Sequence, residues 1–266
     1  MEIFKETFFI YASISGILIA GLCSFVGVYV ILKRVVFIGL ALSEIAALGV
    51  ALGFLLGFRS EIAALFLVFG SIIFFWKQGK EEKQLSNESV IGAIYVISGA
   101  LGLILISKNP RVEASGFDLV KGNILYTMTS DLWFLGVLAV VIVVTHILLY
   151  KEFLFVSFDR ETAHTVGLNT SLYEFILYLS IGIVVAVSMR VGGILFVFGS
   201  MVVPPLISLT LFKKVNLIFV FSIIVATISV IIGLILSYFV DLPTTPTILC
   251  IYGLVFLLAN ISKKII

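Results

Sequence analysis

Long apolar runs separated by short polar breaks fill this chain, and that alternation constrains its fold more than any other feature. We assign the runs to nine ranges, near 7–32, 36–57, 61–76, 89–107, 132–150, 172–189, 193–212, 215–240 and 247–262. Most are long enough to cross a hydrocarbon core of about 30 Å, which needs about 20 helical residues. The third and ninth are short, so the pattern predicts eight or nine membrane helices.

Composition excludes a soluble protein and a membrane β-barrel. Apolar residues make up 61% of the chain and charged residues 12%, against roughly 45–50% and about 25% in soluble domains. Barrel strands alternate apolar and polar residues over about 10 positions, whereas runs such as FSIIVATISVIIGLIL do not alternate. We therefore predict an all-α polytopic membrane helix bundle, with residues 1–266 forming a single transmembrane domain. The net charge of +2 gives no basic field for nucleic acid.

Lysine and arginine are unevenly divided between alternate polar breaks. Eleven of the seventeen fall in one set: Lys33, Arg34, Lys77, Lys80, Lys83, Lys151, Arg160, Lys213, Lys214, Lys263 and Lys264. The other six are Lys5, Arg59, Lys108, Arg111, Lys121 and Arg190. Cytoplasmic loops of membrane proteins carry the excess of basic residues. The first set is therefore predicted to face the cytoplasm, with the carboxyl end inside.

Sequence patterns of catalysis are absent. The chain has no GxxxxGK[ST] phosphate loop, so it has no ATP hydrolysis site of that kind, and it has no HExxH or GxSxG pattern. We interpret His146 and His164 as interfacial or solvated histidines rather than a catalytic pair. The chain is therefore not predicted to be an enzyme.

The polar segment SFDRETAHTVGLN, Ser157 to Asn169, is predicted to form a short surface helix. Asp159 can cap its amino end, Glu161 lies in its first turn, and Gly167 can end it. A connection between two membrane helices needs no helix of its own. The segment is therefore a candidate docking element for a cytoplasmic partner, and the alternative is a simple helical connector.

Several stretches, in order along the chain, carry a family resemblance. They are VGVYVILKRVVFIGLALSEIAALGVALG (Val26 to Gly53), DLVKGNIL (Asp118 to Leu125), the E-x-A-x-x-x-G spacing of Glu161, Ala163 and Gly167, VGGILFVFGSMVVPPLIS (Val191 to Ser208) and DLPTTPTILCIYGLVFLL (Asp241 to Leu258). Together they resemble the zinc- and manganese-type ABC-importer permeases, the ABC-3 family, and the E-x-A-x-x-x-G spacing resembles the coupling loop of ABC importers.

The resemblance implies a permease subunit of an ATP-driven importer in the bacterial inner membrane. Its cargo would be a divalent cation of the zinc or manganese class, delivered by an extracytoplasmic metal-binding protein, and its pore would be a homodimer. Glu161, Ala163 and Gly167 would dock on a separate cytoplasmic ATP-binding subunit, which supplies the ATPase site. No covalently bound cofactor is implied.

The departures from the family pattern concern the metal ligands. The family's second-helix motif has an aspartate and a histidine four residues apart, and here these positions are Leu40 and Glu44. A fourth-helix histidine of many relatives matches Val96, and a loop aspartate matches Asn123. Imidazole suits zinc, whereas carboxylate oxygen suits harder ions such as manganese. Zinc selectivity is therefore not carried over.

Glu44 lies within an apolar helix, where an ionised carboxylate costs about 2.5–3.5 kcal/mol on insertion scales. Its neighbours are small, among them Ser43 and Gly39, which favours close helix packing over exposure to lipid. We assign Glu44, with Ser43, as the candidate metal site lining the ion path. A two-fold dimer could bring two copies of Glu44 to a shared axis. The alternative is a structural Glu44 that pairs with a polar group on another helix.

Four other polar or helix-breaking positions receive structural interpretations. Pro204 and Pro205 are predicted to kink their helix for packing, with an ion contact at the freed carbonyls as the alternative. Arg190 is interpreted as an outer-interface anchor. Glu174, near the inner end of its helix, is interpreted as reaching the lipid headgroups.

Two other functions remain open on the sequence. An ion-gradient secondary carrier could use Glu44 as a proton or cation site, but such carriers usually show an internal repeat, and none is visible. A protein with the permease fold that no longer moves a metal would also account for the altered ligand positions.

Overall fold

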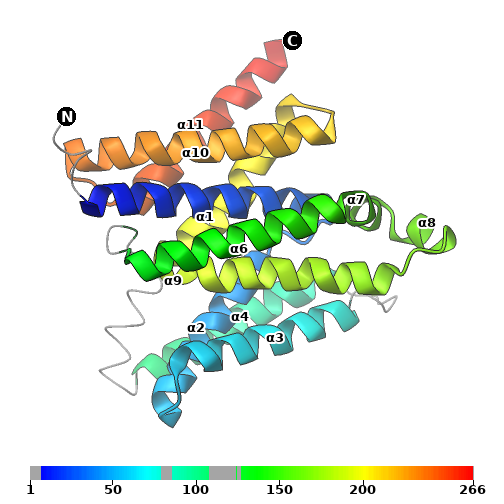
Figure 1. The fold of residues 1–266 in the computed structure, drawn as a ribbon, viewed down its shortest axis with the longest axis horizontal. Coiled ribbons are helices and arrows are strands. Elements are labelled where there is room, and N and C mark those ends of the chain that lie inside the picture. Colours follow the sequence, from blue (N-terminus) through cyan, green and yellow to red (C-terminus); the bar gives the residue numbers. More distant parts are fainter. Residues whose placement is uncertain (1–6, 79–85, 108–123, 125–126, 266) are drawn as a thin grey trace. The chain divides into compact units, whose positions relative to one another are not determined.

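The computed structural model describes residues 7–78, 86–107, 124 and 127–265 and is built from α-helices (Figure 1). The helices are α1 (Thr7–Leu32), α2 (Ile38–Leu56), α3 (Ser60–Gln78), α4 (Asn87–Ser107), α6 (Thr129–Leu148), α7 (Tyr150–Phe158), α8 (Arg160–Thr165), α9 (Thr170–Leu211), α10 (Val215–Val240) and α11 (Thr244–Ile265). None of the residues described in these ranges lies in a β-strand. The predicted all-α fold is confirmed.

Helix α9 explains how the predicted number of membrane segments is reached. Seven helices of the described chain are long and apolar enough to cross a membrane, and α3 is a shorter apolar helix. At 42 residues, α9 has about twice the length that one crossing needs. Inside it, Gly193 has φ 77° and ψ 164°, a conformation essentially restricted to glycine. The break separates α9 into the two predicted runs, so eight membrane-length segments and α3 correspond to the nine ranges.

The helices form two compact units, which are described separately. Unit 1 comprises residues 1–31, 121–141 and 188–266, and unit 2 comprises residues 32–120 and 142–187. Unit 1 therefore contains most of α1 and of α6, the second part of α9, α10 and α11. Unit 2 contains α2, α3, α4, α7, α8 and the first part of α9.

Unit 1 is held by small residues and paired hydroxyls between helices. Ser24 of α1 and Ser222 of α10 share a hydrogen bond of 2.6 Å. Pro205 has no N–H for the carbonyl of Met201 one turn earlier, and this carbonyl packs directly against Gly27 of α1. The contact supports the interpretation of the two prolines as a packing device.

Unit 2 also depends on close helix approach. Gly49 of α2 packs on the backbone of Ala64 in α3, where a side chain at position 49 would collide with it. Small residues at such crossings let two backbones approach closely in a membrane. At the far end of α3, the Trp76 indole N–H donates to the carbonyl oxygen of Ser171 in α9, at 2.7 Å. These contacts fix α3 between α2 and α9.

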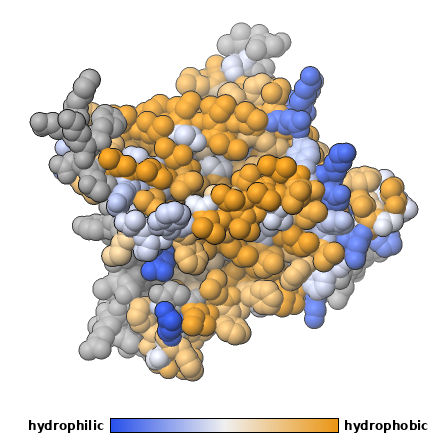
Figure 2. Space-filling view, viewed as in Figure 1, coloured by the Kyte–Doolittle hydropathy of each residue, from blue (hydrophilic) through white to orange (hydrophobic). Residues whose placement is uncertain are grey.

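Large apolar side chains lie exposed on the helices that have long hydrophobic runs. Figure 2 shows a broad hydrophobic surface over α6 and α10. On α6 the exposed residues include Trp133, Phe134, Val137, Val140 and Val144. An apolar exterior of this extent is expected where acyl chains replace water. With seven membrane-length helices in its described part, the chain is an integral membrane protein.

The junction after α6 differs from the sequence-based prediction. The short helix α7 takes the place of a polar connector, beginning two residues after α6 ends. His146, near the end of α6, is fully buried, with its ring 4.8 Å from that of Phe153 in α7. Its Nδ1 lies 2.9 Å from the carbonyl oxygen of Ile142. The interpretation of His146 as solvated is therefore wrong, whereas His164 is exposed as predicted.

Candidate functional site

Glu44 is placed on α2 at the side that faces α4. It is the seventh residue of the helix, so it lies about 9 Å from the helix start at 1.5 Å per residue. A Cβ atom at Gly99 of α4 would lie 3.4 Å from its Oε2, so the carboxylate packs close to Gly99. Glu44 is half-buried. Sequence and packing thus keep a carboxylate at the α2–α4 contact.

Within the described part of the chain, no cation forms an ion pair with Glu44, and no side chain of another helix is hydrogen-bonded to it. The alternative in which Glu44 pairs with a polar group on another helix therefore finds no partner among these residues. A carboxylate in an apolar environment needs a compensating charge or a proton. The site is chemically suited to receive a cation.

Ser43 and Glu44 are not equivalent in this arrangement. Ser43 is fully buried, and its hydroxyl donates to the carbonyl oxygen of Gly39 at 2.8 Å. Consecutive helical residues point about 100° apart, so Ser43 and Glu44 do not share one face. Ser43 can offer an ion only the lone pairs of its oxygen.

The other positions of the family's metal motif add no charged ligand. Leu40 lies one turn before Glu44 on the same side of α2, and Val96, on α4 one turn before Gly99, is 64% exposed. Asn123 lies outside the described residues. The described residues contain no group of three or more His, Cys, Asp or Glu side chains that could hold a metal ion. The described part of one chain therefore brings a single carboxylate to this place.

The predicted helix in the segment Ser157–Asn169 is present as α8, with the predicted cap. The backbone N–H of Thr162 donates to Asp159 Oδ1 at 3.0 Å, and the hydroxyl of Thr162 donates to the second carboxylate oxygen. These hydrogen bonds, that of the hydroxyl first, hold the pKa of Asp159 below its ordinary value. Gly167 follows the helix with φ 89°, in the left-handed region that favours glycine.

The three residues predicted to dock on an ATPase have different surroundings. Glu161 and Gly167 are exposed, whereas Ala163 is fully buried by this chain itself. The backbone N–H of Leu168 donates to the carbonyl oxygen of Ala163 at 3.1 Å, which folds the end of α8 back on itself. Ala163 therefore seats α8 against its own chain, and Glu161 and Gly167 remain available to a partner.

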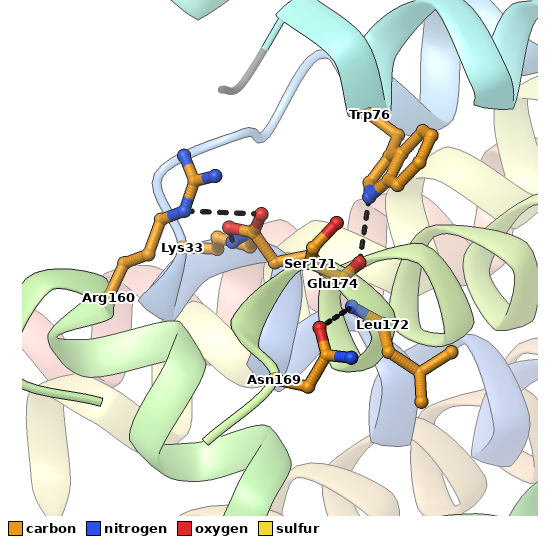
Figure 3. Close-up of polar contacts among 7 residues, drawn as sticks. All are labelled: Lys33, Trp76, Arg160, Asn169, Ser171, Leu172 and Glu174. Carbon is orange, nitrogen blue, oxygen red and sulfur yellow. Dashed lines mark hydrogen bonds and ion pairs between the residues drawn. The ribbon is translucent and has the colours of Figure 1, made fainter. Parts of the chain in front are cut away.

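Beside α8 lies an ionic cluster that the sequence-based interpretation missed: Lys33, Arg160 and Glu174 (Figure 3). Glu174 is 3% exposed, with Lys33 Nζ at 2.6 Å from Oε1 and Arg160 Nε at 3.3 Å from Oε2. The prediction that Glu174 reaches the headgroups is wrong, because two cations of its own chain hold it inside. The signal available in the sequence was that Lys33 and Arg160 belong to the same set of basic breaks. Their meeting at one carboxylate supports the placement of these breaks on a common side.

Comparison with known proteins agrees with this architecture. The sequence profile of the ABC 3 transport family matches residues 5–263. The "Probable metal transport system membrane protein" of Chlamydia muridarum is 31% identical over 260 residues, covering 94% of this chain and 86% of the relative. The "Manganese transport system membrane protein MntC" of Listeria monocytogenes is 28% identical over 250 residues, covering 93% and 88%.

A solved structure has the same fold. It is described as "PsaBC from Streptococcus pneumoniae in complex with Fab" and superimposes with a TM-score of 0.84 at 22% sequence identity. The match covers 97% of this chain and 92% of the solved chain. The two chains therefore share their arrangement of helices over nearly their whole length.

Proposed function

This protein belongs to the ABC 3 transport family, and we propose that it is the permease subunit of an ATP-driven importer of a divalent transition-metal cation of the zinc or manganese class. It is an integral membrane protein of the bacterial cytoplasmic membrane. A separate cytoplasmic subunit supplies the ATPase site, and an extracytoplasmic metal-binding protein delivers the ion. The names of the Listeria and Chlamydia relatives support this proposal.

The observation that carries the proposal for the ion path is the environment of Glu44. Its carboxylate lies at the α2–α4 contact beside Gly99, with no cation of the described chain to balance it. A hard carboxylate oxygen without a neighbouring imidazole favours Mn²⁺ over Zn²⁺. Within the proposed class, the donor chemistry of this chain therefore points toward manganese.

One carboxylate is too few for a transition-metal ion, and this supports a dimeric pore. Mn²⁺ and Zn²⁺ take four to six ligands in proteins, and a second copy of the chain would supply a second Glu44. Two facing carboxylates repel each other unless a cation lies between them. The proposed homodimer would therefore place the passing ion between two copies of α2.

The proposed docking element for the ATPase is α8. It is capped by Asp159, exposed at Glu161 and ended by Gly167. It lies between α7 and α9, in one of the polar breaks that carry the excess of basic residues. Ala163 contributes by seating α8 rather than by touching the ATPase.

The test is transport by the complex of permease, ATPase and binding protein in liposomes, measured for Mn, Zn, Fe, Co and Ni. We expect ATP-dependent uptake of at least one ion, and a loss of at least about tenfold in Glu44→Gln, since even residues that only support metal ligands change activity about 10- to 100-fold. Glu152→Gln is the matched control, because Glu152 lies on α7 outside the membrane-length helices.

Three outcomes contradict the proposal in different ways. Unchanged uptake in Glu44→Gln removes Glu44 from the ion path. Uptake that needs no ATP identifies a secondary carrier. A complex that neither transports nor hydrolyses ATP in response to any of the five metals identifies a permease fold that has lost metal transport.

A further inference from the structure

Three segments of unit 2 meet around one buried carboxylate. Glu174 belongs to the first part of α9, Arg160 begins α8, Lys33 lies in the connector between α1 and α2, and Tyr178 lies one turn further along α9. The ammonium group of Lys33 also lies 5.6 Å from the centre of the Tyr178 ring. The Glu174 cluster, defined as Lys33, Arg160 and Glu174, thus joins segments that are far apart in sequence.

Burial makes the geometry of this cluster demanding. The side chains of Lys33, Arg160 and Glu174 are 11%, 33% and 4% exposed. A buried ion pair is favourable only when its partners keep close contact, and loss of one partner leaves an uncompensated charge. The three segments therefore cannot shift independently without breaking a charge contact.

One arm of the cluster leads to the proposed docking helix. Arg160 is the first residue of α8 and directly precedes the exposed Glu161. Asn169 Oδ1 accepts from the backbone N–H of Leu172 at 3.2 Å and so caps the start of α9 (Figure 3). The loop between α8 and α9 is thus held at its α8 end by the Leu168–Ala163 hydrogen bond and at its α9 end by Asn169. A displacement of α8 therefore moves Arg160 relative to Glu174.

The other arm leads to the helix that carries Glu44. Lys33 begins a five-residue connector in which Arg34 has φ 57°, an uncommon left-handed conformation for a residue other than glycine. At the other end of the connector, the backbone N–H of Phe37 donates to Glu88 Oε1 at 3.2 Å. Helix α2 starts at the next residue, and Glu44 lies about two turns further on.

We propose that Glu174 is a positioning residue that transmits the movement of α8 to the connector before α2, and through it to the ion path at Glu44. The inference rests on the proposed function, in which an ATPase moves α8. In chemical terms, the Glu174 carboxylate of α9 pairs with Arg160 of the docking helix α8 and with Lys33 of the connector that leads to the ion-path helix α2.

The first experiment measures the number of metal ions transported per ATP hydrolysed by the assembled complex in liposomes. In Glu174→Gln we expect this ratio to fall by about fivefold or more, the range of energetic coupling between distant sites. A residue with a structural role only would lower the amount of complex without changing the ratio. Arg160→Gln removes one arm and should lower the ratio as well, whereas Lys151→Gln, an exposed cation on α7, should leave it unchanged.

The double variant separates coupling from two independent defects. If Arg160 and Glu174 act as a unit, Arg160→Gln combined with Glu174→Gln should be no worse than Glu174→Gln alone. Ratios equal to that of the unchanged complex in both single variants would overturn the proposal.

A second measurement does not depend on metal transport. A spin label is attached at Phe37→Cys in a chain with Cys250→Ser, because Phe37 and Cys250 are exposed and the remaining Cys23 is buried. ATP binding by the partner ATPase should change the label's mobility, and Glu174→Gln should abolish that change. A label that never responds, or that responds equally in Glu174→Gln, overturns the inference. Absence of metal uptake by the unchanged complex would instead count against the proposed function.

Discussion

Glu44 and Glu174 are both glutamates within membrane-length helices of unit 2, but they differ in burial and in ion pairing. Glu174 is 3% exposed and held by Lys33 and Arg160. Glu44 is half-buried beside Gly99, and no cation of the described chain pairs with it. One carboxylate is neutralised by its own protein, whereas the described residues of this chain offer the other no neutralising charge.

The difference teaches how to separate a structural acid from a transport acid in a membrane helix. Both carry the cost of removing a carboxylate from water. An internal ion pair offsets that cost permanently, so it fixes structure. A carboxylate without an internal partner remains ready for a mobile cation, so it is the one expected to meet the cargo.

The largest expected effect comes from replacing each acid by leucine. Glu174→Leu leaves Lys33 buried without its partner, so we expect a loss of about 3 kcal/mol in the free energy of unfolding. Glu44→Leu removes a charge that has no ion-pair partner among the described residues, so stability should be unchanged or raised. Thermal unfolding of the two variants in detergent measures the difference directly. Equal destabilisation by both would erase the distinction between the two glutamates.

The second effect is stabilisation by the cargo. A metal ion that binds the folded protein at about 100 times its Kd adds about 2.7 kcal/mol. Mn²⁺ should therefore raise the unfolding temperature of the unchanged protein and of Glu174→Gln, but not that of Glu44→Gln. If Glu44→Gln were stabilised as strongly as the unchanged protein, the ion would bind elsewhere.

The fold could be predicted closely because lipid imposes a simple rule on the chain. Every backbone polar group in the hydrocarbon core must be satisfied internally, so long apolar runs become helices. The runs near 172–189 and 193–212 show the limit of this reasoning. The sequence-based ranges leave residues 190–192 between them, but the structure continues the helix through these residues, with Gly193 as a single non-helical residue. Run lengths do not reveal whether a break is a loop or a kink.

The candidate site could be predicted only in part, because partners depend on tertiary contacts. Glu44 stands out in the sequence since it is an acid in an apolar run. Glu174 stands out in the same way, and nothing local shows that Lys33, more than a hundred residues earlier, will lie 2.6 Å from it. Likewise, Ala163 and Gly167 are both small in the sequence, but one is buried and the other exposed.

A smaller effect is expected from filling the space beside Glu44. A Cβ at Gly99 would lie 3.4 Å from Glu44 Oε2 and 3.6 Å from Cδ, so Gly99→Ala would place a methyl group in direct contact with the carboxylate. We expect uptake to fall severalfold. Gly92→Ala is the matched control on the same helix, because no atom lies within 4 Å of a Cβ there. Both variants should gain about 0.5–1 kcal/mol of helix stability, so equal uptake in the two would show that the space at Gly99 is not needed.

The smallest effect concerns the cap of α8, which lies at the exposed end of the Glu174 cluster. Hydrogen bonds from Thr162 lower the pKa of Asp159, so the cap contributes fully above the carboxyl's ordinary pKa of about 4 and is lost only as the pH falls through the lowered value. ATPase binding to the permease should therefore show no loss from this group between about pH 8 and about pH 5. Asp159→Ala should weaken ATPase binding by less than about tenfold. Asp159→Asn should weaken it less than Asp159→Ala does, because the asparagine side chain can still cap α8. A strong loss in Asp159→Asn would mean that the ATPase recognises the charge itself rather than the helix that the charge caps.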